Sequence, residues 1–180
     1  MQSPLEITDE EQYWLQSRDV SDSPKIGGDE YFDDHDVTRF EDLTADDLPP
    51  ADSEAVREID REALEERKVI GKWQVTGSAE RIEELWPELL ADAEEGIIWA
   101  VKAMTAFGYE NLPMYDEYLL TVYTPNYFER HDIGRVRAHL RDEHGVTHEL
   151  YYKPDMYTAK GIVAETVEEF GLSAPARYVD

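Results

Sequence analysis

Three of the six lysines in this chain lie within apolar runs that predict β-strands. They are Lys72 in VIGKWQVT, Lys102 in IIWAVKAM and Lys153 in HELYYKPDMYT. Because the side chains of a strand alternate between two faces, these lysines are expected to point away from the core residues beside them. Ammonium groups that share one face of a sheet could hold a phosphate or a carboxylate through charge-assisted hydrogen bonds. The alternative is that they are strand-edge residues whose charges are paired with nearby carboxylates.

The same C-terminal stretch offers further candidate ligand-binding residues. Tyr151 and Tyr157 belong to a group of tyrosines that is denser than a core needs, and at least one could offer a hydroxyl or a stacking surface. Lys160 could add another cation to the phosphate-binding set Lys72, Lys102 and Lys153. No side chain is assigned as catalytic.

Four of the five histidines lie between residues 131 and 148. His144 and His148 have an H-x3-H spacing, but Gly145 would break the helix needed to align them, and no H-E-x-x-H motif occurs. The acidic run 29–36 has the charge of a calcium loop but lacks its central glycine and its terminal glutamate spacing. We therefore expect neither a metal site nor a cofactor.

Composition limits the class of protein. The net charge is −25, and residues 1–68 carry 22 acidic and 7 basic side chains while residues 69–180 carry 20 and 10. An acidic excess that covers the whole chain favours a halophile's protein, in which high salt screens the repulsion; an ordinary acidic protein is the alternative. No basic stripe suits an extended nucleic-acid surface, and no apolar run is long enough for a bilayer. The first residues lack the features of a signal peptide, so we expect a cytoplasmic protein.

Periodicity supplies the elements that must position these groups. Helices are predicted at 52–67, at 78–95 with a kink or break at Pro87, and at 132–144. Strands are predicted at 69–76, 97–104, 117–124 and 147–153, with a loop at 108–114 and a further strand or irregular segment at 154–165. This order predicts an α+β fold, in which helices pack on one face of a curved, mainly antiparallel sheet and leave the other face open.

The chain before residue 51 is expected to differ from the rest. Residues 1–50 predict an acidic, largely irregular N-terminal arm that docks on the core, since Pro and Gly punctuate 19–50 and aromatic residues are scattered through it. Tyr13 and Trp14, within a short helix or strand at 9–16, suggest where the arm docks. Residues 51–180 are expected to form a single α+β domain.

Several motifs together resemble a known family. They are Gly71-Lys72-Trp73, LWPELLADAEEG, the strand VKA, YLLTVYTPNY, the helix RVRAHLR and YYKPDMYTAKGI. Over about residues 69–165 the chain resembles the basophilic-leukaemia-expressed protein family, whose members are often labelled phosphothreonine lyase domain-containing proteins. We interpret the chain as a halophilic archaeal member.

That family is similar in fold to the messenger-RNA cap-binding translation initiation factor 4E. In the cap binder, basic residues on comparable strands hold the cap phosphates, and Lys72 and Lys102 are the matching positions. Stacking on a methylated base needs two tryptophans before the Gly-basic-Trp strand, and this chain has only Trp14 there. The resemblance therefore implies phosphate binding rather than cap recognition.

The lyase label implies β-elimination of phosphate from phosphothreonine, which needs a base, an acid and cations around the phosphate. Bacterial effector lyases carry a Lys-any-His pair, and no lysine here has a histidine two positions later. A lyase would have to use Lys72 or Lys102 as the base and a histidine from 131–148 as the acid.

The leading hypothesis from the sequence is a phospholigand-binding domain, for a nucleotide, a phosphopeptide or an RNA end, that uses a lysine-lined sheet face. A phosphothreonine lyase-like enzyme and a protein-interaction module that uses the outer helices are the alternatives. The expected partner is a phosphorylated small molecule, a nucleotide or a phosphopeptide, and neither a membrane nor an extended nucleic acid.

Overall fold

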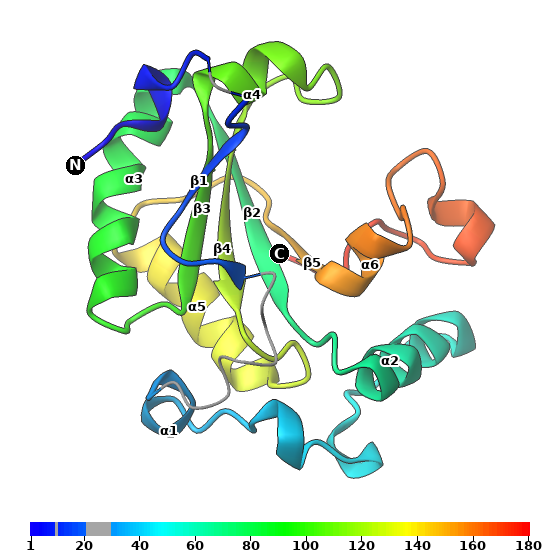
Figure 1. The fold of residues 1–180 in the computed structure, drawn as a ribbon. Helices are drawn as coiled ribbons and strands as arrows, with labels where there is room; N and C mark the ends of the chain where they lie inside the picture. Colours follow the sequence, from blue (N-terminus) through cyan, green and yellow to red (C-terminus); the bar gives the residue numbers. More distant parts are fainter. Residues whose placement is uncertain (10, 21–29) are drawn as a thin grey trace.

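One curved antiparallel sheet organises the chain (Figure 1). The structure is a computed structural model that describes residues 1–9, 11–20 and 30–180. In the described residues the strands lie in the order β1-β3-β4-β2-β5-β6, and every neighbouring pair is antiparallel. Their bounds are β1 Trp14–Gln16, β2 Gly71–Gly77, β3 Ala100–Met104, β4 Tyr118–Thr124, β5 Tyr151–Pro154 and β6 Tyr178–Val179.

Helices α3 and α5 cover one face of this sheet (Figure 1), which confirms the predicted α+β fold. The helix bounds are α1 Tyr31–Asp34, α2 Glu54–Glu66, α3 Ala79–Glu94, α4 Ala106–Asn111, α5 Arg130–Asp142 and α6 Asp155–Ala159. Short 3-10 turns lie at Pro4–Glu6, Phe40–Asp42, Ala45–Asp47 and Val167–Phe170. Within the described residues, no helix has both the length and the apolar character needed to cross a bilayer.

Helix α3 shows why these residues form these elements. Ser78 caps its first turn by accepting a hydrogen bond from the Arg81 amide, and the buried residues Ile82, Leu85 and Leu89 repeat at helical spacing. The helix continues through Pro87 as one element, so the alternative of two short helices is wrong. Burial of this apolar face outweighs the hydrogen bond that proline cannot donate.

Two segments differ from their predicted form. The predicted loop 108–114 begins as helix α4, because the Thr105 hydroxyl accepts a hydrogen bond from the Gly108 amide at 2.9 Å and caps the turn. Residues after Pro154 form α6 rather than a strand, since Pro154 takes the N-cap position with extended backbone angles. β3 and β5 are also shorter than predicted, and they begin three and four residues later, respectively.

The tryptophans at the predicted inward positions face the helices. The Trp73 indole donates to the carbonyl of Ile133 in α5 at 3.0 Å, and its ring meets Tyr152 of the neighbouring strand edge to face. Trp99 and Val101 are buried as well. This face of β2, β3 and β5 is therefore the core face, and the lysines lie on the other.

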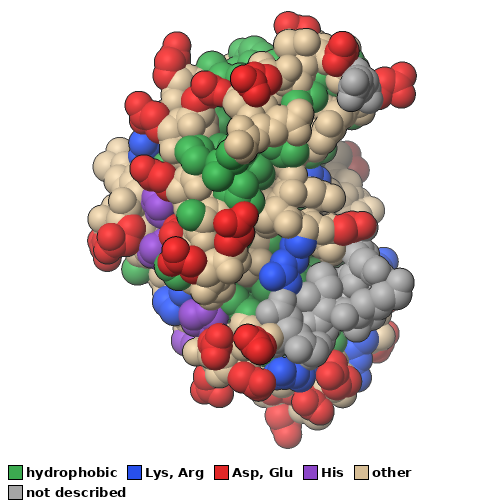
Figure 2. Space-filling model, turned by 60° about the vertical axis from the view of Figure 1, so that its left-hand side comes forward, with side chains coloured by type: hydrophobic (Ala, Val, Ile, Leu, Met, Phe, Trp, Pro, Cys, Tyr) green, Lys and Arg blue, Asp and Glu red, His purple; other side chains and the backbone are tan. Residues whose placement is uncertain are grey.

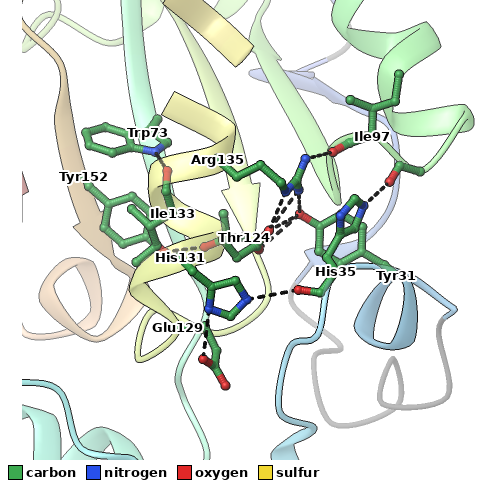
Figure 3. Close-up of polar contacts among 12 residues, drawn as sticks. Tyr31, His35, Trp73, Ile97, Thr124, Glu129, His131, Ile133, Arg135 and Tyr152 are labelled. Carbon is green, nitrogen blue, oxygen red and sulfur yellow. Dashed lines mark hydrogen bonds and ion pairs between the residues drawn. The ribbon is translucent and has the colours of Figure 1, made fainter. Parts of the chain in front are cut away.

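The segment from Tyr31 onwards docks against α5 through buried polar contacts (Figure 3). The Tyr31 hydroxyl donates to the fully buried Asp132 carboxylate at 3.0 Å, and Arg135 pairs with the same carboxylate at 2.8 Å. Burial and the Asp132 charge raise the pKa of Tyr31, so the phenol stays neutral. Arg135 also donates to the carbonyl of Ile97 at 2.7 Å, which joins the segment, α5 and the chain before β3.

Further along this segment, apolar side chains enter the core. Phe32, Val37, Phe40 and Leu43 are all buried. They lie in the segment 19–50, which the sequence predicts to be largely irregular, and residues 21–29 of it are outside the described part of the chain. Hydrophobic burial here fixes a stretch with little regular secondary structure.

Candidate ligand-binding pocket

Lys72, Lys102 and Lys153 line one pocket of about 690 Å³ on the sheet face opposite α3 and α5. They come from three different strands, β2, β3 and β5. Lys72 lies directly across from Lys153 in the β2–β5 pairing, and Lys102 lies across from Thr121 of the strand between β2 and β3. The predicted sharing of one face therefore results from the register of the sheet, since directly opposed residues point the same way.

Two rows of side chains form the floor of this hollow, which we call the lysine pocket. One row runs Lys153, Lys72, Tyr123, and the next runs Gln74, Thr121, Lys102. The floor is thus polar, with Lys72 and Lys153 on its β2–β5 side, Lys102 on its β3 side, and the Tyr123 ring of β4 between them.

The walls come from four segments that lie apart in sequence. The N-terminal arm supplies Trp14 and Val20, the end of α2 and the chain after it supply residues 66–68 and Ile70, and α6 supplies Asp155, Thr158 and Ala159. Tyr115, from the loop before β4, closes the side nearest the arm and meets Trp14 edge to face, with ring centroids 6.3 Å apart. The volume and the mixture of aromatic and charged lining are typical of small-molecule sites.

The ammonium groups differ in how their charge is compensated. Lys72 donates to the Asp155 carboxylate at 2.5 Å and to the Thr158 hydroxyl at 2.9 Å. The Lys102 ammonium lies 4.7 Å from the centre of the Trp14 ring, a cation–π distance. In the described part of the chain, no carboxylate forms an ion pair with Lys102 or Lys153.

The pKa values of Lys102 and Lys153 reflect this difference in charge compensation. Burial lowers the pKa of Lys102, and the neighbouring charge of Lys72 lowers it further, while Asp155 and Asp19 oppose the change. Burial and the charge of Lys72 also lower the pKa of Lys153. An anion placed among these three groups would relieve both the desolvation and the mutual repulsion.

Three other predicted ligand residues lie outside the lining of the lysine pocket. Tyr151 is exposed and its hydroxyl donates to Glu149 at 2.7 Å. Tyr157 is buried in the core at 1% exposure. Lys160 forms an ion pair with Glu62 of α2. The density of tyrosines in this stretch therefore reflects core packing and surface hydrogen bonds rather than the pocket.

Several lining residues were not predicted from the sequence as ligand-binding residues. Thr121 and Tyr123 follow the same alternation as the lysines, so strand parity could have identified them once the pairing of β4 with β2 was known. Trp14 and Asp155 reach the pocket only through tertiary structure. Trp14 comes with an edge strand, and Asp155 comes with the turn into α6.

The histidines that a lyase would need as acids do not line the pocket. His131 contacts the carbonyl of His35 at 3.0 Å beside α5, and the His148 ring accepts from the Thr76 amide at 3.4 Å near the far end of β2. His139 and His144 lie with α3 and α5 on the other side of the sheet. What the pocket offers chemically is therefore anion binding and lysine amines.

The charge of the pocket lining is opposite in sign to that of the chain as a whole. Figure 2 shows acidic side chains spread over the face of the molecule that it displays, with few basic ones among them. Five basic and two acidic side chains line the pocket, in a chain whose net charge is −25. The pocket is a local reversal of the charge of the whole molecule.

Comparison with known proteins identifies the family. The family model described as basophilic leukemia-expressed protein Bles03 matches residues 29–161, which include all three lysines. None of the curated proteins matches the chain. The chain belongs to the Bles03 family.

Proposed function

We propose that this member of the Bles03 family binds a phosphorylated ligand in the lysine pocket. The observation that carries the proposal is the convergence of Lys72, Lys102 and Lys153, from three strands, on one hollow in a highly acidic chain. Burying cations is unfavourable unless an opposite charge meets them. Lys102 and Lys153 have no carboxylate partner among the described residues, so a ligand anion is the group that fits.

The dimensions favour more than a lone phosphate ion. A pocket of about 690 Å³ holds a group of nucleotide or short-peptide size, and the Trp14, Tyr115 and Tyr123 rings provide apolar walls for its uncharged part. We infer a nucleotide, a phosphopeptide or an RNA end. The likeness to the cap-binding fold stays part of this proposal, and the placement of Lys72 and Lys102 on neighbouring parts of one sheet face supports it.

The N-terminal arm is part of the proposed site. Trp14 and Val20 line the pocket, although they precede the domain that we propose for residues 51–180. Strand β1 holds Trp14 there by pairing with β3, and Gln16 lies across from Lys102. Ligand binding and docking of the arm are therefore expected to support each other.

Binding of inorganic pyrophosphate and of ATP tests the proposal directly. We propose a halophilic setting because acidic groups cover both halves of the chain, so titration calorimetry is best done in molar potassium chloride. A charge-assisted hydrogen bond contributes about 1.5–3 kcal/mol, so Lys102→Ala should weaken binding by roughly 10- to 150-fold. Lys160→Ala is the matched control, since it removes the same charge outside the pocket. Equal affinity in the Lys102→Ala variant and in the unaltered chain would contradict the proposal.

Phosphothreonine β-elimination is the second candidate, and the lowered pKa of Lys102 favours it. A neutral Lys102 amine could take the α-proton, the electron pair would form the Cα–Cβ double bond, and phosphate would leave from Cβ with its charge held by the other lysines. Incubation with a phosphothreonine peptide should then yield dehydrobutyrine and free phosphate. Binding of the peptide without either product would remove this candidate and keep the binding function.

A further inference from the structure

A second cluster of chemically active side chains lies on the helix side of the sheet. Asp92 of α3 faces His139 of α5 and His144 just after α5. The Asp92 Oδ2 atom is 2.7 Å from His139 Nε2 and 2.6 Å from His144 Nε2, and the two Nε2 atoms are 3.3 Å apart. All three side chains are largely buried, with exposed fractions of 16%, 17% and 7%.

The local sequence explains this convergence. Glu88 and Asp92 are four residues apart on α3, so they lie on the same face of the helix. α5 ends at Asp142, and Gly145 takes a positive φ of 61° that turns the chain back. The turn places His144 against α3, whereas the H-x3-H spacing with His148 brings no contact between those two rings.

We propose that Asp92, His139 and His144 bind a zinc-like divalent transition-metal ion. Imidazole nitrogens and carboxylate oxygens are zinc ligands, at about 2.0–2.1 Å for nitrogen. Two nitrogens 3.3 Å apart, each at that distance from one ion, subtend between about 104° and 111° at it, close to the tetrahedral angle. The Asp92 oxygen must move away from the two nitrogens by about 0.6–0.7 Å to reach the same 3.3 Å spacing.

Glu88 provides independent support for a metal site. Its carboxylate lies 3.0 Å from Nδ1 of His144. A carboxylate that accepts from one ring nitrogen fixes the tautomer in which the other nitrogen presents its lone pair, as in carboxylate–histidine–zinc arrangements. A shared-proton network satisfies the cluster less well, because two Nε2–H groups that both donate to Asp92 would face each other at 3.3 Å.

The metal would join elements that cover one face of the sheet. Asp92 belongs to α3, and the histidines belong to α5 and its C-terminal loop. Three protein ligands leave the fourth position to water. Because the lysine pocket lies on the opposite face, the ion would brace the fold and would not touch a ligand in that pocket.

Cobalt titration tests this site. The chain is first stripped of metal with a chelator. It is then titrated with Co²⁺ in molar potassium chloride, with excess Mg²⁺ to occupy surface carboxylates. Visible absorption reports the binding of Co²⁺. We expect one Co²⁺ per chain with a tetrahedral-type spectrum that Zn²⁺ abolishes. Asp92→Ala and His139→Ala should weaken binding by at least about 100-fold, and Glu88→Gln by about 10- to 100-fold. His148→Ala is the matched control and should bind as the unaltered chain does.

A second readout covers variants that fold poorly. Zn²⁺ at about a hundredfold above its dissociation constant should raise the unfolding midpoint by about 5–10 °C in the unaltered chain, and by much less in Glu88→Gln, whose changed side chain is mostly exposed. No cobalt spectrum, or equal Co²⁺ affinity in His139→Ala and the unaltered chain, would overturn the proposal. The cluster would then be a shared-proton network only.

Discussion

Replacing Lys153 with methionine asks whether its ammonium group serves a ligand or the fold. Lys153 lies directly across from Lys72, and burial together with the charge of Lys72 lowers the pKa of Lys153. Like charges at directly opposed strand positions destabilise a sheet by roughly 0.2–1 kcal/mol. Methionine retains most of the length of lysine without its charge. Lys153→Met should therefore raise the free energy of unfolding of the ligand-free chain by about 0.2–1 kcal/mol.

The same change should weaken ligand binding. If Lys153 donates one charge-assisted hydrogen bond to a phosphate, its loss costs about 1.5–3 kcal/mol, which is a 10- to 150-fold increase in the dissociation constant for pyrophosphate. Stability and affinity should thus move in opposite directions. A lysine with a structural role would lose stability on replacement and leave affinity unchanged.

The dependence on pH provides a second signature. The pKa of Lys153 in the folded chain lies below the unfolded value of about 10.4. Between those two values the unfolded chain binds more protons than the folded chain, so stability rises with pH. The destabilisation is fully present below the folded pKa and disappears as pH rises towards the unfolded value. The stability advantage of Lys153→Met over the unaltered chain should shrink in that interval.

Urea denaturation and titration calorimetry, both in molar potassium chloride, measure the two quantities. Lys160→Met is the control, because it removes a partly exposed ion pair with Glu62 and leaves the pocket lining intact. Its stability should change by no more than about 1 kcal/mol, with pyrophosphate affinity unchanged. A loss of more than 1 kcal/mol of stability in Lys153→Met, with unchanged affinity, would refute the reasoning.

Other changes test the neighbouring contacts. Asp155→Asn leaves the buried Lys72 ammonium without its carboxylate and should lower the free energy of unfolding by about 1–3 kcal/mol. Scanning calorimetry with pyrophosphate present should show a smaller loss of stability, because the bound anion replaces the missing charge. Tyr31→Phe removes the hydroxyl that donates to the buried carboxylate on α5; urea denaturation should show a loss of about 1.5–3 kcal/mol with no change in pyrophosphate affinity. Gly108→Ala places a Cβ against the Tyr13 carbonyl of the arm, so limited proteolysis should cut the arm faster than in the unaltered chain, and equal rates would count against close packing there.

Much of the sheet follows from patterns local to the sequence. The alternation of Lys72 with Trp73, and of Lys102 with Val101, correctly predicts which side chains join the apolar core and which line the opposite face of the sheet. Ser53 and Ser78 cap α2 and α3, which begin within two residues of the predicted starts at 52 and 78. These signals are strong because burial of one face must repeat with the period of the backbone.

The remainder depends on contacts between distant segments. Nothing near Asp155 indicates that its carboxylate would meet Lys72, 83 positions earlier. Gly145 is expected to keep His144 and His148 from aligning, but nothing in the histidine spacing indicates that His144 would meet Asp92 of α3. Such tertiary contacts depend on how helices and strands pack against each other, and no short window of sequence encodes that packing.

The two edge strands of the sheet are short. Within the described residues, β1 has three residues and β6 has two, so these edge strands offer few backbone amides and carbonyls to another molecule. In concentrated salt, where repulsion between acidic surfaces extends only about 3 Å, charge alone would no longer keep neighbouring copies apart. Short edge strands disfavour edge-to-edge pairing of sheets at any ionic strength, and so they should limit aggregation of this chain under conditions in which its many carboxylates cannot.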